Sequence, residues 1–186
     1  MILIIFLTLL YISEPYLLSS GNKLYEQGVV EMKQGIVHDM IKPDHLLKAI
    51  IYFRVAMIKG YKERSIFTNA YWCYHDYDFS HPWYRSIESV LTKGLKYYPQ
   101  DIEFYFRRAN ARTELKEFQN ALLDYDMAIL LDKTRQYEYI NEAFYNRGAV
   151  RYMIGDQTGA RNDFIKGQKM SGYTFREYHD YCKKWK

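Results

Sequence analysis

The chain reads IEFYFRRANARTELKEFQNALLDYDMAILLDKTR at residues 102–135, and the pattern returns as NEAFYNRGAVRYMIGDQTGARNDFIKGQKMSGY at residues 141–173. Each stretch has an aromatic residue, a small residue, a turn, an alanine, a second aromatic and a second small residue. The matched pairs are Tyr105 and Phe144, Ala109 and Gly148, Ala121 and Ala160, Tyr125 and Phe164, and Ala128 and Gly167. Small residues let helices approach closely and aromatic rings fill the space between them, so each stretch is predicted to form two antiparallel helices of about 13 residues.

This pattern resembles the tetratricopeptide repeat (TPR), a helix-turn-helix repeat of 34 residues with small and aromatic residues at these offsets. Both stretches depart from the family pattern at the same places, where arginine replaces a leucine and a tyrosine, and at the closing proline. The replacing residues are Arg108 and Arg147, Arg112 and Arg151, and Lys133 and Gly172. Two repeats that agree even in their departures are harder to produce by chance than one loose match.

The chain before residue 102 carries the same spacing in a looser register. Helices are predicted at residues 23–34, 46–59, 63–74 and 86–99, with enlarged connections at residues 35–45 and 75–83. The resemblance thus implies an all-α fold, a right-handed stack of about four TPR-like helix-turn-helix repeats that fills residues 22–172. The approximate bounds of the repeats are 22–60, 63–99, 102–135 and 141–172. Residues 173–186 are predicted to form a C-terminal capping helix, because such stacks need a polar outer face for solubility.

The first twelve residues, MILIIFLTLLYI, are almost wholly apolar. As a helix they would reach roughly 18 Å, short of the roughly 30 Å of a bilayer core. Residues 1–21 are therefore predicted to be a signal peptide or an N-terminal membrane anchor, since Ser19-Ser20-Gly21 offers small residues before a cleavage point. A helix packed on the body of the protein is the alternative. The predicted location is exported or membrane-associated, with an organellar (mitochondrial) membrane as the alternative.

The two cysteines, Cys73 and Cys182, lie about two repeats apart along the predicted stack. A disulfide requires Cα atoms within about 7 Å of each other. Two free, partly buried thiols are therefore predicted.

Composition and motifs argue against nucleic-acid binding and catalysis. The chain has 26 basic and 22 acidic residues and a net charge of +4, with both signs interspersed, whereas phosphate binding needs clustered lysine and arginine. It contains no glycine-rich phosphate loop, nucleophile elbow, zinc-protease motif or paired-cysteine motif. The densest group of possible metal ligands runs from His75 to His81, and a polar turn is favoured there because structural metal sites need four donors in fixed geometry. We expect no enzyme activity, no cofactor, no metal and no small-molecule substrate.

Proteins of the family that this chain resembles line a concave groove with the first helices of their repeats, using places two, five, six, nine and twelve of each repeat. The residues at these places are predicted to contact a protein partner, as an extended segment or a helix laid in the groove. They are Tyr25, Val29, Arg64, Phe67, Tyr71, Tyr74, Glu103, Phe106, Arg107, Asn110, Tyr145, Asn146, Ala149 and Tyr152. Aromatic rings, amides and arginines are typical of protein-binding hot spots. The alternative is that the rings pack between neighbouring repeats.

Family members that hold the terminal carboxylate of a peptide use asparagines and lysines in this groove. Asn110 and Asn146 occupy asparagine places of that kind, but Phe106 occupies a lysine place. The resemblance therefore implies an incomplete carboxylate clamp.

Aromatic residues make up 18% of the chain, and three rings fall in the connection at residues 75–83. These rings, Tyr77, Phe79 and Trp83, are expected near the surface, where large apolar groups need cover. They are predicted either to fold back over neighbouring helices or to dock on a partner or a membrane interface.

Together these features predict a non-catalytic protein–protein interaction scaffold or assembly factor that binds a partner protein through the groove and is exported or tethered to a membrane. The alternative is a structural accessory subunit of a large membrane complex, for instance an organellar one, whose N-terminal helix stays in the bilayer.

Overall fold

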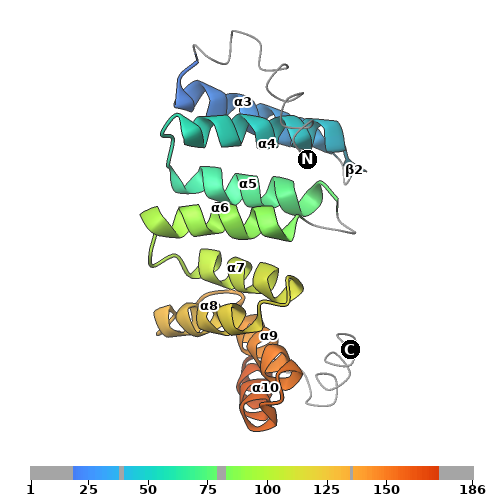
Figure 1. The fold of residues 1–186 in the computed structure, drawn as a ribbon, viewed down its shortest axis with the longest axis vertical. Coiled ribbons are helices and arrows are strands. Elements are labelled where there is room, and N and C mark those ends of the chain that lie inside the picture. Colours follow the sequence, from blue (N-terminus) through green and yellow to red (C-terminus); the bar gives the residue numbers. More distant parts are fainter. Residues whose placement is uncertain (1–18, 38–39, 79–82, 135, 172–186) are drawn as a thin grey trace. The chain divides into compact units, whose positions relative to one another are not determined.

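A computed structural model describes residues 19–37, 40–78, 83–134 and 136–171, and these residues are mostly helical (Figure 1). The predicted all-α fold class is confirmed. The helices are α3 (Gly21–Gly35), α4 (Pro43–Ile58), α5 (Arg64–Asp76), α6 (Tyr84–Tyr97), α7 (Ile102–Glu114), α8 (Phe118–Leu131), α9 (Ile140–Met153) and α10 (Gln157–Ser171). The sequence did not predict the two-residue antiparallel ladder between α3 and α4, which pairs β1 (Ile36–Val37) with β2 (Met40–Ile41).

The chain divides into two compact units, with the boundary between Trp83 and Tyr84. Helices α3, α4 and α5 belong to the first unit, and α6 to α10 belong to the second. The boundary falls inside the predicted second repeat, residues 63–99, so the two helices of that repeat lie in different units.

In the first unit, α3 packs along α4, and α5 contacts both helices (Figure 1). Gly28 in α3 faces Phe53 in α4 so closely that a Cβ on the glycine would lie 2.6 Å from the ring. The Phe53 side chain is fully buried. Ser20 begins α3 by accepting a hydrogen bond from the Lys23 backbone N–H, and Pro43 stands at the first position of α4. The small residue predicted at Gly28 is therefore needed for the contact between the two helices.

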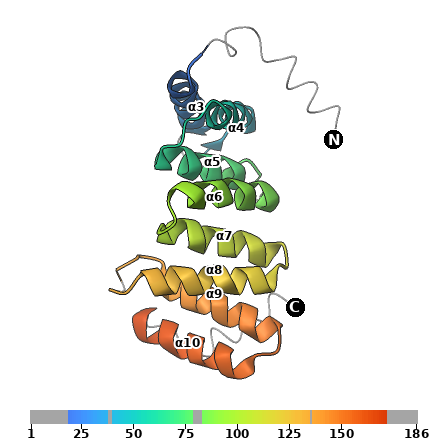
Figure 2. The same ribbon diagram turned by 60° about the vertical axis from the view of Figure 1, so that its left-hand side comes forward.

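In the second unit, α7 pairs with α8 and α9 pairs with α10, while α6 packs on α7 and α8 packs on α9 (Figure 2). A Cβ on Gly148 in α9 would lie 2.6 Å from the ring of Phe164 in α10. This contact repeats the one between Gly28 and Phe53. The small and aromatic places read from the sequence thus meet across the helix pair in both units.

The turns that close the two helix pairs of the second unit share one backbone conformation. Lys116, after α7, has a φ of 60°, and Gly155, after α9, has a φ of 90°. Both angles lie in the left-handed region, which glycine adopts readily and lysine only rarely. The two residues occupy the same place of their repeats, so the chain follows the same path through both turns.

Some sequence predictions concern residues outside the described ranges. The apolar residues 1–18, the capping helix at residues 173–186, Phe79 and Cys182 are among them. Within the described ranges, no helix has both the length and the apolar character that crossing a bilayer requires.

Candidate partner-binding face

Two of the predicted groove residues join the first helices of the third and fourth repeats, α7 and α9. Asn146 Nδ2 donates a hydrogen bond to Asn110 Oδ1 over 3.0 Å, and the Tyr125 hydroxyl donates to the same oxygen over 2.7 Å. Both lone pairs of the Asn110 carbonyl oxygen are therefore in use. The link makes α7 and α9 present one continuous face, which we call the α7–α9 face.

The rings predicted at place five of this face lie in the core instead. Phe106 is 5% exposed and Tyr145 is 3% exposed. Phe106 packs in the cluster that contains Tyr125, and Tyr145 lies against Gly167 of α10. Both rings are packed within the second unit, as the alternative of rings packed in the stack expects.

Arg107, at place six, is held by a carboxylate of its own helix. Its Nε donates to Glu103 Oε1 over 2.7 Å, one turn earlier in α7, and both side chains are largely buried. The charge of Arg107 is thus balanced within the face. On the α7–α9 face, a terminal carboxylate would have to compete with Glu103 for Arg107.

The connection between α8 and α9 covers part of the same face. The ring of Tyr139 stacks on Phe106 with centroids 5.9 Å apart, and the ring of Tyr137 meets Phe106 edge-on at 6.0 Å. Asp132 is buried and accepts hydrogen bonds from the backbone N–H groups of Gln136 and Tyr137 over 3.0 and 3.2 Å. The connection is therefore an ordered part of the face. Sequence reasoning did not single out these tyrosines.

Glu142 is a further groove residue that sequence reasoning missed. It lies 39 positions after Glu103 and so holds the same place two of the next repeat. The surrounding protein, which displaces water from the carboxylate, and the charge of Glu138 raise the pKa of Glu142. The signal was available, because the register that places Glu103 on the face also places Glu142 there.

Two of the predicted groove residues of the first unit, Tyr25 and Arg64, lie in different surroundings. Tyr25 stacks on Tyr61 with centroids 4.6 Å apart, and its hydroxyl accepts a hydrogen bond from Asn69 Nδ2 over 3.2 Å. Because Asn69 lies in α5, this bond links the first helices of the first and second repeats. Arg64 is exposed at the start of α5, and its guanidinium lies 3.5 Å from the Thr68 hydroxyl.

Three further predicted groove rings, Phe67, Tyr71 and Tyr74, are buried in α5. Like Phe106 and Tyr145, they are packed in the core of their unit, as the alternative of packed rings expects.

The aromatic residues at the end of α5 lie close to one another. The ring of Trp83 is 4.9 Å from Tyr77 and 5.9 Å from Tyr74, and the Trp83 backbone N–H donates to the Tyr74 carbonyl. Trp83 is nevertheless 37% exposed, as is Trp72, which the sequence analysis did not single out. Trp83 therefore packs back on its own unit while part of its ring remains open to solvent.

The groups with possible chemistry in this region are paired or buried. His75 Nδ1 lies 2.7 Å from Asp76 Oδ1. Cys73 is a free, buried thiol, and burial raises its pKa to about 12, so the reactive thiolate is scarce. Within the described ranges, no three His, Cys, Asp or Glu side chains gather as a metal site.

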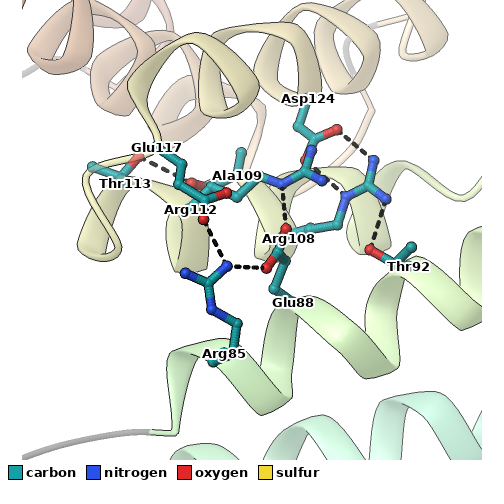
Figure 3. A network of polar contacts seen from close by, with 9 residues as sticks. All are labelled: Arg85, Glu88, Thr92, Arg108, Ala109, Arg112, Thr113, Glu117 and Asp124. Atoms are coloured by element: carbon teal, nitrogen blue, oxygen red, sulfur yellow. Dashed lines mark hydrogen bonds and ion pairs between the residues drawn. The ribbon is translucent and has the colours of Figure 1, made fainter.

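The arginines that depart from the family pattern close an ion-pair network in the third repeat (Figure 3). Arg108 holds Asp124 with two hydrogen bonds of 2.8 and 2.6 Å, and Arg112 reaches the same carboxylate over 2.8 Å. Arg108 also donates to Thr92 over 3.1 Å, and Arg112 donates to Glu88 over 3.1 Å, both on α6. One buried aspartate thus binds two arginines, and the arginines tie α8 and α6 to α7.

Arg85 extends this network to the surface (Figure 3). Its guanidinium lies 2.9 Å from Glu88 and 2.6 Å from Glu117. Because Arg85 is mostly exposed, its ion pairs contribute much less to stability than the buried ones.

The fourth repeat builds the same arrangement. Arg147 binds Asp163 with two hydrogen bonds of 2.8 and 2.6 Å, and Arg151 reaches Asp163 over 2.8 Å. Arg147 also binds Asp126 on α8 over 2.6 Å. Burial opposes the charge of Arg147, but the hydrogen bonds and charges of Asp163 and Asp126 offset that effect and raise its pKa. We call the two arrangements the arginine clamps.

Solved structures similar to this chain are tetratricopeptide-repeat structures, so the predicted fold is confirmed. The Arabidopsis OM64 TPR domain matches with a TM-score of 0.51 and 17% identity, over 71% of this chain and 94% of that chain. Structures of MamA from AMB-1 and MSR-1 both match with a TM-score of 0.56, at 13% and 14% identity, over 84% and 81% of this chain and 94% of each of theirs. By sequence, no family model and no curated protein matches the chain.

Proposed function

We propose that the chain is a non-catalytic scaffold that binds a segment of a partner protein on the α7–α9 face. The observation that carries the proposal is the hydrogen bond from Asn146 to Asn110, which joins two successive first helices into one surface. Repeat folds of this kind use such surfaces to hold extended segments or helices of other proteins.

The packing beneath the face supports this function. Phe106 and Tyr145 anchor the two helices from below, and the arginine clamps fix each helix to its partner. A surface that is already ordered loses less conformational entropy when a partner binds. Polar side chains at places two and six of both repeats then remain on the face to orient the bound segment.

Site-specific photo-crosslinking in cells tests the proposal. A photoreactive amino acid is placed at Asn146 or Glu142 on the α7–α9 face, and at Gln119 of α8 or Asn162 of α10 as matched controls. Both control side chains are exposed on second helices of the same unit. We expect one or a few proteins to be captured from the face positions and to be absent from the control positions.

Equal capture from all four positions would contradict the proposed face, as would capture from the controls alone. Thermal unfolding of each variant serves as the check that the substituted proteins are folded.

We further propose that the chain is exported or tethered to a membrane by residues 1–21. The apolar run at residues 1–12 followed by Ser19-Ser20-Gly21 supports this location. Mass spectrometry of the intact protein purified from its native membranes or medium provides the test. Loss of about 21 residues indicates export with cleavage, retention of Met1 in a membrane fraction indicates an anchor, and retention of Met1 in a soluble fraction contradicts both.

A further inference from the structure

The connection between α8 and α9 is an addition to the ordinary repeat. Matching residues of the third and fourth repeats lie 39 positions apart, whereas the TPR period is 34. The additional residues include Tyr137, Glu138 and Tyr139, which come just before α9. Because Tyr137 and Tyr139 both pack on Phe106, the added residues lie against the α7–α9 face.

The part of the face beside this connection is rich in acids. Glu103 and Glu142 stand at place two of successive repeats, and Glu138 lies between the two tyrosines. Glu138 and Glu142 are exposed. Arg107 faces this group, and it is bound to Glu103. We call the five residues Glu103, Tyr137, Glu138, Tyr139 and Glu142 the acidic tyrosine surface.

The charges of this surface act on one another. Burial and the charge of Glu103 raise the pKa of Tyr137, and Arg107 only partly opposes them. A hydrogen bond with Glu138 raises the pKa of Tyr139, and Glu138 also raises the pKa of Glu142. The negative charge gathered here therefore exceeds what Arg107 balances.

The two tyrosines add a second feature to this surface. The hydroxyl oxygen of Tyr137 is buried and has no hydrogen-bond partner within the described part of the chain. Because this oxygen is closed off from the surface, a bound segment would contact the rings of Tyr137 and Tyr139 rather than the hydroxyl. Tyrosine rings also attract cations to their faces.

We propose that the acidic tyrosine surface binds a cationic segment of the partner protein, rich in arginine or lysine. The segment places its positive side chains beside Glu138 and Glu142 and against the rings of Tyr137 and Tyr139. A peptide carboxylate is disfavoured, because Arg107 is bound to Glu103 and the charges of Glu138 and Glu142 repel an anion. This inference rests on the proposed function of the α7–α9 face and specifies the chemistry of its partner.

Fluorescence anisotropy with three labelled peptides of equal length tests the inference on the full chain. Serine alternates with arginine in the first peptide, with glutamine in the second and with glutamate in the third. The test variant is Glu138→Gln/Glu142→Gln, and the matched control is Glu26→Gln/Glu63→Gln, which removes the same charge from two exposed positions of the first unit. We expect the arginine peptide to bind more tightly than the others, the test variant to weaken it at least about tenfold, and the control to change it less than about twofold.

The arginine and glutamine peptides binding alike would overturn the inference, as would equal losses in the test and control variants. If the glutamate peptide binds best and a photoreactive group at Glu142 or Asn146 captures it, the cationic partner is rejected while the proposed function stands. If no peptide binds and the photo-crosslinking positions on the face capture nothing in cells, the proposed function fails as well.

Discussion

The two units use different chemistry at equivalent places of the repeat. In the second unit, places seven and eleven of α7 and α9 hold arginines, and place twenty-three of α8 and α10 holds the buried aspartate that they bind. In the first unit, the places of the two arginines hold Gln27 and Glu31 in α3, and the place of the aspartate holds Tyr52 in α4. Between these helices, His45 Nδ1 instead lies 2.7 Å from Glu31 Oε2. The first unit therefore has no arginine clamp between α3 and α4.

What the two units share is the contact of a small residue with a ring. Gly28 meets Phe53 in the first unit, and Gly148 meets Phe164 in the second. In both places a Cβ on the glycine would lie 2.6 Å from the ring. The comparison teaches that this contact sets the close approach of the paired helices, whereas the polar places are free to vary. The arginine clamps then add stability and specificity to helix pairs whose geometry is already determined.

Removal of one clamp carboxylate tests this division most strongly. Asp163→Asn removes the buried charge that binds both Arg147 and Arg151 and leaves the buried Arg147 with the half-exposed Asp126 alone. We expect a loss of about 3–5 kcal/mol in the free energy of unfolding, because a buried charge without its partner is strongly destabilising. Urea unfolding followed by circular dichroism measures the change.

Asp126→Asn is the matched control, because Asp126 binds the same Arg147 but is half exposed. We expect this substitution to cost no more than about 1 kcal/mol. Similar losses in the two variants would show that burial does not distinguish the clamp from an ordinary surface pair.

Place eleven of the repeat holds an arginine in α7 and α9 but Cys73 in α5. This difference leads to a prediction about the rate at which the Cys73 thiol reacts. In a Cys182→Ser background, Cys73 should react with a thiol reagent at about pH 8 roughly a thousandfold more slowly in the folded protein than in urea, because burial raises its pKa to about 12 and limits access. Absorbance of the released thiolate reports the rate.

Cys73→Ser in the same background gives the baseline for the labelling experiment. Fast labelling of the folded protein would mean that α5 opens readily, and it would contradict the burial of this thiol in the core of the first unit.

The shared glycine contact predicts matched losses in the two units. Gly28→Ala and Gly148→Ala each force a methyl group against a buried ring, and we expect each to cost about 1–3 kcal/mol, because a packed core accepts added volume poorly. Urea unfolding measures both losses. Adding Phe53→Leu or Phe164→Leu to the respective variant should recover part of the loss, and no recovery in either unit would reject the ring as the source of the clash.

The sequence predicted the helix pairs well because the pattern of small and aromatic residues is local. The sequence alone pairs Gly148 with Ala109 and Phe164 with Tyr125 at matching places of the two repeats. The paired arginines stand out as departures from the family pattern, but the sequence analysis does not single out Asp124 and Asp163, although they follow Arg108 and Arg147 by the same 16 positions. A search of the repeats for charges at matched offsets would have found them.

The open face was harder to predict than the fold. Place five was assigned to the groove by resemblance, yet Phe106, Tyr145 and Phe67 are buried. Whether a ring at the edge of a helix faces solvent depends on what covers it, and Phe106 is covered by Tyr137 and Tyr139 from an added connection. Such a connection does not follow the periodicity of the repeat, so its path could not be read from the pattern.

The smallest expected effect concerns a second acid in the clamp-bearing α7. Glu114 stands at the C-terminal end of the helix, where burial raises its pKa. A folded-state pKa above the unfolded one means that the neutral form is favoured in the fold, so the stability this group contributes at low pH is lost as the pH rises through the folded pKa. At neutral pH the charged form of Glu114 therefore lowers the stability of the fold, in contrast to Asp124, whose charge two arginines balance.

Glu114→Gln should raise the free energy of unfolding by less than about 1 kcal/mol at neutral pH, with the gain vanishing near about pH 4. Urea unfolding of the two proteins at both pH values measures this difference, and a gain that stays constant between them would mean that charge has no part in it.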